Sequence, residues 1–389
     1  MRTWEYLFWI SCLLIIYNYA GYAFIAYFFN VFKKKKALPS PVTDDDLPYV
    51  SFIVAAYNEE DCIETKIKNS LEQDYPEHKI EFLFITDGSS DNTMEIIKRY
   101  PAIQLLHQQE RKGKSAALNR VVAQANNDIL IFSDANALLN KEATRLIASH
   151  YLDKKVGGVA GEKKVLATTQ VAEQVGVTEG FYWKYESFLK KIDSEFYSVV
   201  GAAGELFSVR KKLYTPVSEK VILDDFIISL KVAEMGYRVM YEPSAYAAEL
   251  PSASITDEKI RKIRISAGGF QSIVLLKSLL LFWKNPRLSF LYISHRVMRW
   301  LITPFCLVIA LISNAALCFY QGTILYKSLF FIQLLFYSAA VLSQLSQRLK
   351  ILKFCHYFVF MNISVIQGFF VFLSGKQSAA WKKAKRTIV

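Results

Sequence analysis

The chain has 389 residues, 52% of them hydrophobic and 14% aromatic, and its formal net charge is +12. This length and composition allow a complete α/β core with apolar residues in excess. Because most of the positive charge flanks apolar segments or lies in the C-terminal tail, it favours anionic lipid over nucleic acid as a partner. Only Cys62 of the five cysteines lies outside an apolar stretch, so neither a disulfide framework nor a zinc cluster is indicated.

The N-terminal segment is predicted to be a transmembrane anchor over residues 1–36. Residues 6–32 hold no charged side chain, are long enough to cross a bilayer and are followed by four lysines at 33–36. A cleaved signal peptide, processed near residues 20–23, is the alternative, but the apolar run is too long and the basic cluster is on the wrong side. By the positive-inside rule the N-terminus is outside and the domain that follows is cytoplasmic.

A polar linker at 37–47 leads into alternating strand and helix patterns. Apolar strands are predicted to begin at 49, 80, 103 and 128, and segments of helical period follow the first three at 60–71, 92–100 and 114–125. This alternation predicts an α/β domain with a parallel sheet over residues 37–266. Polar residues end each strand, and in such sheets ligands collect beyond the carboxyl ends of the strands.

Two of these strand ends carry carboxylates suited to a ligand. Asp134 closes the strand from 128, two residues before Asn136, which is how a sheet presents oxygen atoms to a metal or a phosphate, although both residue types also end strands simply by making turns. Asp87 precedes Gly88, which permits a tight turn, and is placed to accept hydrogen bonds from a base or a ribose.

A basic helix start follows the third strand. The segment Lys112-Gly113-Lys114-Ser115 is not a P-loop, because Gln108 stands where that motif needs a glycine. The start of a helix with basic side chains can still attract a pyrophosphate without the full motif.

Three further segments contain candidate functional residues. Asp224 and Asp225 lie between apolar residues, where paired carboxylates indicate a cation, hydrogen-bond donors or a general base, and a helix N-cap explains only one of them. The small residues before Glu205, up to Gly204, would let a substrate approach the backbone, or would serve close packing. Residues 261–264 hold three basic side chains, which taken alone favour lipid headgroups as their partners.

The C-terminal third is predicted to contact or cross the membrane. Residues 267–294 are predicted to be a helix in the membrane interface, and residues 295–375 to hold two or three spans. Each of the uncharged stretches is long enough to cross: 301–326, 328–347 and 354–375.

The third stretch leaves the topology open. As a span it would carry the basic tail, 376–389, to the outside against the positive-inside rule, whereas Asn362 and Gly368 would also suit an interfacial helix. If a product is exported, polar residues of these segments should line its path, unless they only bond neighbouring helices; the candidates are His295, Arg296, Arg299, Asn314, Gln333, Asn362 and Gln367.

Taken together, the motifs resemble those of a known enzyme family. In order they are Ala56-Tyr57-Asn58-Glu59, Thr86-Asp87-Gly88-Ser89-Ser90-Asp91, Lys112 to Asn119, Ser133-Asp134-Ala135-Asn136, Gly204-Glu205-Leu206-Phe207, Asp224-Asp225 and Arg261 to Arg264. This series strongly resembles the membrane-bound enzymes of glycosyltransferase family 2, a group that includes cellulose, hyaluronan and poly-N-acetylglucosamine synthases.

The resemblance implies a Rossmann-like GT-A fold and inverting transfer of a sugar from a nucleotide-sugar, usually a uridine diphosphate sugar, with Mg²⁺ or Mn²⁺. It also implies the roles of individual residues. Asp225 would be the catalytic base and Asp134 with Asn136 the metal ligands, while Gly204, Glu205 and Asp224 would contact the acceptor. The nucleotide-sugar would be held by Tyr57, Glu59, Asp87, Lys114, Asp134, Arg261 and Arg264.

Two departures from the family pattern bear on the function. Asn136 stands where the family has a second acid, which leaves a cation one charged ligand fewer, and the last motif lacks both the glutamine and the tryptophan of the family's Gln-x-x-Arg-Trp. Processive synthesis of a polysaccharide and transfer of a single sugar to a lipid or lipid-linked acceptor are therefore both open. A catalytically silent nucleotide-binding subunit is disfavoured because Asp87, Asp134 and Asp225 are all present.

Overall fold

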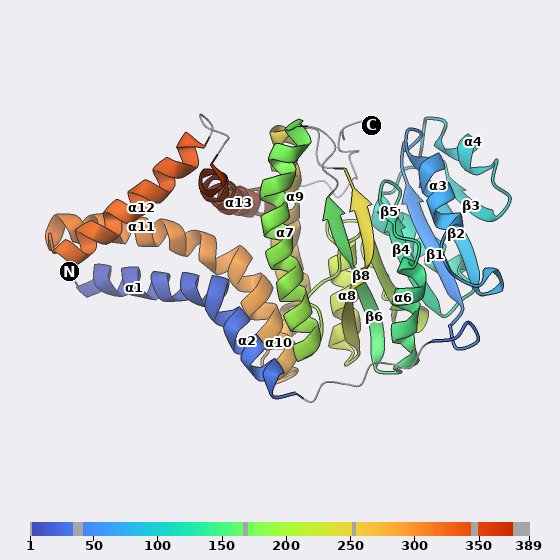
Figure 1. Cartoon of the computed structure of the whole chain (residues 1–389), viewed down its shortest axis with the longest axis horizontal. Helices are drawn as coiled ribbons and strands as arrows, with labels where there is room; N and C mark the ends of the chain where they lie inside the picture. Colours follow the sequence, from blue (N-terminus) through green and yellow to red (C-terminus); the bar gives the residue numbers. More distant parts are fainter. Residues whose placement is uncertain (1, 34–41, 166–169, 251–253, 344–348, 376–389) are drawn as a thin grey trace.

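The computed structural model describes residues 2–33, 42–165, 170–250, 254–343 and 349–375. An eight-stranded mixed sheet forms one end of the molecule, and long apolar helices form the other (Figure 1). The strand order is β3-β2-β1-β4-β7-β6-β8-β5. Lysines 34–36, residues 37–41 of the predicted linker, Arg348 and the basic tail lie outside the described residues.

The first half of the sheet agrees with the predicted alternation. Strands β1, β2, β3 and β4 pair in parallel, and helices α3, α4 and α5 follow the first three of them. Their bounds are β1 Val50–Ala56, β2 Ile80–Asp87, β3 Ile103–Gln108, β4 Ile129–Asp134, α3 Ile63–Leu71, α4 Thr93–Ile97 and α5 Lys114–Gln124. The α/β fold expected from the sequence is confirmed, and the carboxyl ends of four strands meet at one edge.

The second half of the sheet was not anticipated. Strand β7 pairs antiparallel with β4 and β6, and β5 pairs antiparallel with β8. The parallel pairing predicted for the first four strands holds, but the sheet as a whole is mixed. The bounds are β5 Leu138–Leu139, α6 Ala143–Ser149, β6 Val156–Val165, α7 Gln170–Phe196, β7 Leu206–Arg210, α8 Asp224–Glu234 and β8 Arg238–Glu249, with short 3₁₀ turns at Glu77–Lys79, His150–Leu152 and Lys211–Leu213.

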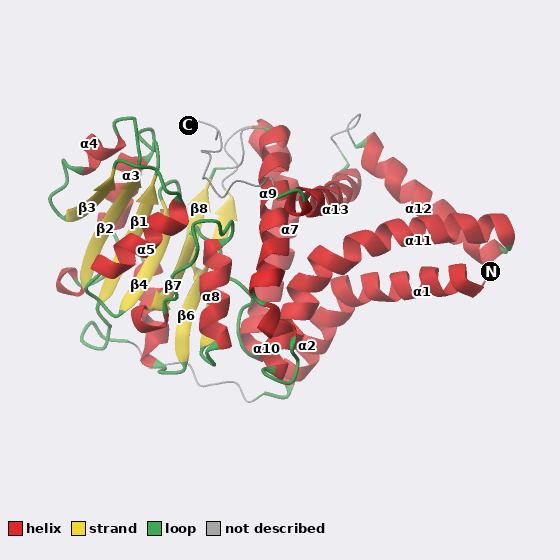
Figure 2. Ribbon diagram, turned by 180° about the vertical axis from the view of Figure 1, so that it is seen from behind, coloured by secondary structure: helices red, strands yellow, loops and turns green. Residues whose placement is uncertain are grey.

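Both faces of the sheet are covered, so its central strands are buried throughout. In β1 the side chains of Phe52 and Val54 pack into the core under α3, α4 and α6, whereas Ile53 and Ala55 pack into the core under α5 and α8. Figure 2 shows α5 and α8 on the face of the sheet turned to the viewer. This two-sided burial explains why β1 appears in the sequence as a continuous apolar run.

Within the described residues, the apolar helices comprise four candidate membrane spans by length and composition: Arg2–Val31, Pro286–Tyr320, Ile324–Leu342 and Ile351–Leu373. The first consists of α1 Arg2–Ile16, a π-helical turn Tyr17–Gly21 and α2 Tyr22–Val31. The others consist of α10 Pro286–Tyr292, the π-helix η6 Ile293–Ile302, α11 Thr303–Tyr320, α12 Ile324–Leu342 and α13 Lys350–Leu373. Four helices of this kind indicate an integral membrane protein.

Helix α13 lies across the other apolar helices. It is seen nearly end-on in both Figure 1 and Figure 2, where α1, α11 and α12 run across the picture. Neither Asn362 nor Gly368 breaks it, and it packs on α9, Ile255–Leu275. By length and composition it is one of the candidate membrane spans, so the choice between an interfacial helix and a third C-terminal span stays open.

Helix α9 also differs from its predicted extent. It begins twelve residues before the predicted boundary at 267 and joins the basic 261–264 segment to the apolar residues in one continuous helix. Ala267, Gly268, Gly269 and Phe270 are buried against the rest of the protein. The exposed apolar side chains of the predicted interfacial region lie further on, at the end of α9 and around the 3₁₀ turn Lys277–Leu280: Val274, Leu275, Leu280, Phe282 and Trp283.

The close approach of α13 to α9 depends on Gly368. A Cβ atom at this position would lie 2.5 Å from Ser266 Cβ and 2.9 Å from the Ile263 carbonyl oxygen, too close for any side chain. Gly368→Ala should therefore separate the two helices and lower the thermal midpoint of the detergent-solubilised protein by several degrees. Gly21→Ala is the control, because a Cβ there meets only ordinary contacts from 3.4 Å outward. Equal melting of the two variants would contradict this packing.

Candidate active site

Asp134 and Lys114 form an ion pair at the carboxyl edge of the sheet. Asp134 is the last residue of β4, Lys114 is the first of α5, and Lys114 Nζ lies 2.6 Å from Asp134 Oδ1. Burial raises the pKa of Asp134, while Lys114 acts to lower it. Although burial acts in the opposite sense, the carboxylates of Asp134, Asp224 and Asp225 hold the pKa of Lys114 above its ordinary value. The site therefore keeps a cation among several acids.

Asp225 approaches the same place from the first turn of α8. Its Oδ1 accepts a hydrogen bond of 2.8 Å from the Phe226 backbone N–H. Burial and the neighbouring Asp224 raise the pKa of Asp225 to about 7, against the opposing effect of Lys114. A carboxylate with a pKa near neutrality is suited to accept and release a proton.

Gly204 lies at the centre of these groups. A Cβ atom built on it would lie 3.0 Å from Lys114 Nζ, 3.3 Å from Asp225 Oδ2 and 3.7 Å from Asp134 Oδ2. Three functional groups from three separate elements therefore converge on one glycine, which leaves space beside the backbone where a side chain would otherwise stand.

Gly204→Ala should test this convergence. The added methyl group would press on Lys114 and fill the space between the two aspartates, so we expect kcat/KM to fall by about 10-fold or more while the fold is kept. The comparison is made with Gly21→Ala by steady-state kinetics and thermal melting. Activity within two-fold of the parent would show that substrate does not use this space.

Asp87 organises the loop that leads to Lys114. Its Oδ2 accepts hydrogen bonds from the backbone N–H groups of Lys112 and Gly113, at 3.0 and 2.5 Å, and its Oδ1 pairs with Arg120 at 2.9 Å. The next residue, Gly88, has φ +70°, as the expected tight turn requires. Asp87 therefore fixes the backbone at the start of α5.

Tyr57 and Glu59 follow β1. The guanidinium of Arg111 stacks 3.7 Å from the Tyr57 ring centroid, which makes a flat platform beside the Asp87 loop. Glu59 is buried, and its carboxylate accepts a hydrogen bond from Cys62 Sγ at 3.3 Å. Asn58 between them has φ 53°, the left-handed conformation that a turn at a strand end requires.

Lys66 is a residue that sequence reasoning missed. It is fully buried and donates hydrogen bonds to Ser133 Oγ at 2.7 Å and to the Ala137 carbonyl at 2.6 Å. These two partners flank the Asp134–Asn136 turn on either side, and burial lowers the pKa of Lys66 to about 7. A signal was present, because Lys66 lies on the apolar stripe of α3 with Ile63, Ile67 and Ser70.

Glu205 and Arg261 lie in a buried charge cluster. Lys163 pairs with Glu205 and also with Glu249, at 2.6 Å, and Arg261 lies 3.8 Å from Glu205. Although burial acts to raise it, Lys163 and Arg261 hold the pKa of Glu205 below its usual range. Lys163 was missed by sequence reasoning because β6, which carries it, was not predicted.

Arg264 faces the aspartates. Burial lowers its pKa, while Asp224, Asp225 and Asp134 act to raise it. Its Nε has no hydrogen-bond partner among the residues that the structure describes. The same holds for Asp224 Oδ2, so both groups retain bonding capacity for a ligand.

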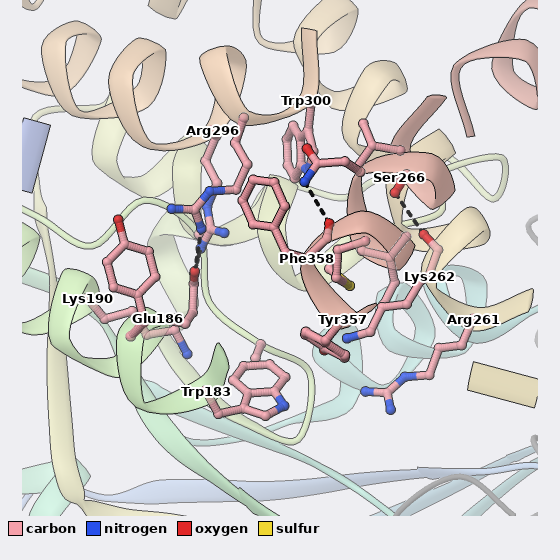
Figure 3. A pocket seen from close by; sticks show the side chains of 18 of the residues that line it. Trp183, Glu186, Lys190, Arg261, Lys262, Ser266, Arg296, Trp300, Tyr357 and Phe358 are labelled. Carbon is pink, nitrogen blue, oxygen red and sulfur yellow. Dashed lines mark hydrogen bonds and ion pairs between the residues drawn. The ribbon is translucent and has the colours of Figure 1, made fainter. Parts of the chain in front are cut away.

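A cavity of 680 Å³ connects this site to the apolar helices (Figure 3). Asp225 and Glu205 lie in the wall contributed by the catalytic domain, together with residues 201–203, Leu223 and Phe226. Arg261 comes from α9, and other wall residues come from the π-helical turn Tyr17–Gly21, α7, α9, η6, α12 and α13. Of the residues proposed for an export path, Arg296, Arg299 and Asn362 line the cavity. Asn314 instead bonds Gln333 at 3.0 Å between α11 and α12, the helix-bonding role that was the alternative.

A buried ionic network supports the arginines of the cavity wall. Glu186 accepts Arg296 at 2.6 Å and Arg299 at 2.8 Å, and these cations hold the pKa of Glu186 well below its usual range although burial raises it. His295, expected to line the path, is instead fully buried and pairs with Asp193 at 2.6 Å. The network ties α7 to η6.

The candidate metal ligands fit a cation that also binds a diphosphate. Within the described ranges, no group of three or more His, Cys, Asp or Glu side chains is arranged to hold a metal ion. Asp134 and the partly buried Asn136 offer two hard oxygen donors, and Asp134 Oδ2 is turned toward Gly204. Mg²⁺ commonly binds to one or two carboxylates and completes its coordination with phosphates and water.

Comparison with known proteins relates the chain to glycosyltransferases. Residues 51–217 match the family Glycosyl transferase family 2. The poly-beta-1,6-N-acetyl-D-glucosamine synthase of Staphylococcus aureus (strain MSSA476) is 27% identical over 294 residues, covering 74% of this chain and 70% of that protein. The enzyme with the same name from Staphylococcus epidermidis is 28% identical over 254 residues, covering 63% of this chain and 59% of that protein.

A solved structure shares the fold. The mannosyltransferase PcManGT from Pyrobaculum calidifontis, in complex with GDP-Man and Mn²⁺, matches with a TM-score of 0.69 and 22% identity and covers 95% of this chain and 100% of that one. The sheet and this match define a GT-A-like domain joined to membrane helices, and the family match and the relatives define it as a glycosyltransferase. More particularly, residues 51–217 match glycosyltransferase family 2, and the chain is a distant homologue of poly-beta-1,6-N-acetyl-D-glucosamine synthase.

Proposed function

We propose that the protein transfers a sugar, with inversion, from a nucleotide-sugar to a hydroxyl group of a glycan acceptor at the membrane. The observation that carries this proposal is the convergence of Lys114, Asp134 and Asp225 on Gly204. Asp225 also lines the cavity that continues into the apolar helices. A donor site and an acceptor site would thus adjoin, with the base Asp225 between them.

The donor would bind along the carboxyl edge of the sheet. Tyr57 stacked on Arg111 would hold the base, and the loop fixed by Asp87 would contact the nucleoside. Lys114 and Arg264 would neutralise the diphosphate, because both are basic and both adjoin the aspartates of the site. A uridine diphosphate sugar is the donor that the family resemblance favours.

Asp225 would serve as the general base. It would take the proton of the acceptor hydroxyl while that oxygen bonds to the anomeric carbon and the bond to the diphosphate breaks, with the leaving charge neutralised by Lys114 and Arg264. A single displacement inverts the anomeric carbon, so an α-linked donor would give a β-linked product. Mg²⁺ or Mn²⁺ held by Asp134 and Asn136 would add Lewis-acid stabilisation of the diphosphate.

The acceptor would lie in the cavity, against Glu205, Asp224 and Arg261. Aromatic side chains along the wall, among them Trp183, Tyr185 and Trp300, offer faces on which sugar rings can stack. The wall also contains membrane helices, so a lipid-linked acceptor is a second candidate, favoured by Phe354, Phe358 and Met361 of α13.

We further propose that the catalytic domain faces the cytoplasm. If α13 lies in the interface, the chain crosses the bilayer three times, at α1–α2, α10–α11 and α12. The basic segments at 33–36 and 376–389 then lie on the side of the catalytic domain, as the positive-inside rule favours. This arrangement avoids the external basic tail that a fourth span would give.

The test is sugar transfer by the purified protein in proteoliposomes, with a panel of labelled nucleotide-sugars and with Asp225→Asn as the inactive control. We expect one donor to label a membrane-associated product, and sizing that product separates a polymer from a single transfer. Donor supplied only on the face of the bilayer that bears the catalytic domain should be sufficient for sugar transfer. The proposal fails if no donor is consumed under conditions in which the protein binds nucleotide diphosphate.

A further inference from the structure

Lys190 of α7 lines the cavity and is almost completely buried, with 3% of its surface exposed. Its Nζ has no hydrogen-bond partner within the part of the chain that the structure describes. Figure 3 shows Lys190 and Trp183 on the α7 side of the cavity and Lys262 and Arg261 on the other side. A buried ammonium group without an acceptor is costly unless a ligand supplies one.

The acids on neighbouring turns and strands are engaged by other groups. Glu186, one turn before Lys190, accepts Arg296 and Arg299 at 2.6 and 2.8 Å. Glu162 of β6 accepts the Ser187 hydroxyl at 2.5 Å and the Tyr241 hydroxyl. Neither acid forms an ion pair with Lys190, so its charge is not neutralised by these carboxylates.

Aromatic rings compensate the burial of the Lys190 ammonium group only in part. Lys190 Nζ lies 5.7 Å from the Trp183 ring centroid and 5.8 Å from that of Tyr241. Lys262 Nζ lies 5.8 Å from the same Trp183 ring, so two ammonium groups share one indole. Cation–π contacts favour a charge in place, but they leave its N–H donors free to bind an anion.

The wall combines many basic side chains with an apolar stretch on α13. Six basic side chains line it against three acidic ones: Lys190, Arg261, Lys262, Arg296, Arg299 and Lys353, against Glu186, Glu205 and Asp225. The α13 side adds Phe354, Phe358, Met361 and Val365. An anionic group joined to an apolar chain fits such a wall better than an uncharged sugar alone.

We propose that Lys190 binds the phosphate of a lipid-linked acceptor, whose apolar chain lies along α13 and whose sugar hydroxyl reaches Asp225. This inference rests on the proposed function, because it names the substrate class for the same cavity. The donor diphosphate is not the anion in question, since its site is assigned to Lys114 and Arg264 at the edge of the sheet. Lys190 acts in binding and takes no part in the chemical step.

The experiment measures binding of dodecyl phosphate to the full-length protein in neutral detergent by native mass spectrometry. Lys190→Gln should weaken binding by about 10-fold or more, because a charge-assisted hydrogen bond is lost. Lys190→Arg should retain binding, and Lys191→Gln, an exposed neighbour on the same helix, should not change it. Dodecanol, which has the chain without the phosphate, should bind equally to all four proteins.

Three outcomes decide the matter. Equal dodecyl phosphate binding by Lys190→Gln and the parent overturns the proposal, and inorganic phosphate bound as tightly as dodecyl phosphate overturns the lipid source of the anion. If Lys190→Gln does not fold, Lys190→Met, which keeps the apolar stem, takes its place. Binding of uridine diphosphate should be unchanged in every variant. If the parent does not bind uridine diphosphate, the proposed function fails. If the parent binds uridine diphosphate but not dodecyl phosphate, only the present inference fails.

Discussion

Asp225→Asn should lower turnover by about 10²-fold or more while leaving nucleotide-sugar binding within a few fold of the parent. The amide keeps the size of the side chain but takes no proton. Asp225 is assigned to the acceptor hydroxyl, whereas the diphosphate is assigned to Lys114 and Arg264, which both remain in the variant. The readouts are kcat from initial rates and donor affinity from calorimetry. Asp45→Asn, an exposed aspartate in the segment before β1, is the matched control.

The pH dependence gives a second, independent readout of Asp225. Because burial and Asp224 raise its pKa to about 7, the base is protonated and inactive below that pH and ionised above it. We therefore expect kcat/KM to rise with pH through about 7 and to level off above it. Asp225→Asn should lose this limb of the profile. A flat profile in the parent between pH 6 and 8, or turnover of Asp225→Asn within a few fold of the parent, would remove Asp225 from the mechanism.

The same shift predicts that the variant is not inactive through unfolding. The folded-state pKa of Asp225 is raised, so the folded protein binds a proton more tightly than the unfolded chain, and the contribution of this group to stability falls as pH rises from about 4 to 7. Asparagine cannot ionise and avoids this loss. At pH 8, Asp225→Asn should therefore melt at or above the temperature of the parent.

The part of the fold that follows local rules could be predicted from the sequence. Strands β1 to β4 are short apolar runs closed by polar residues, so their ends and their parallel pairing follow from composition and alternation. Asp87, Asp134 and Lys114 were located for this reason, since each stands at the junction between a strand or loop and the next helix. Family resemblance then supplied the roles that position alone does not give.

The other half depends on contacts that are distant in sequence. Strand β7 enters the sheet antiparallel between β4 and β6, and β8 brings Glu249 beside Lys163, 86 residues away. The charge cluster around Glu205 arises only from this pairing, so no local sequence pattern predicts it. The cavity likewise combines α7, α9, η6 and α13, and its cationic wall becomes visible only once these helices are placed.

The positions of Lys66 and Gly368 on their helices indicate roles that the strand and motif patterns do not predict. A lysine on the apolar face of α3 indicates a buried hydrogen-bonding role, and a glycine in an apolar helix indicates either a break or a close helix contact. In α13 the glycine makes a close helix contact and does not break the helix, because Gly368 packs directly on Ser266 and the helix continues to Leu373.

Asp134→Ala should abolish transfer, and transfer by the parent should require Mg²⁺ or Mn²⁺. Asp134 supplies the one carboxylate of the proposed metal site and also pairs with Lys114 at 2.6 Å, so its loss removes a ligand and leaves a buried cation unpaired. Asp134→Asn separates these two effects, because an amide oxygen can still accept a hydrogen bond from Lys114. If the metal role dominates, both variants should lose activity by at least about 10²-fold.

Asn136→Asp provides the opposite test at the same turn. It restores a second carboxylate where the family pattern has one, so a cation should bind more tightly and transfer should persist, with half-maximal activity at a lower Mn²⁺ concentration than in the parent. Lys66 should continue to hold the turn through Ser133 and Ala137, since neither partner is changed. Manganese titrations of the parent, Asn136→Asp and Asp134→Asn after treatment with a chelator provide the comparison. Full activity of the parent in excess chelator would show that Asp134 serves Lys114 alone and that the site works without a metal ion.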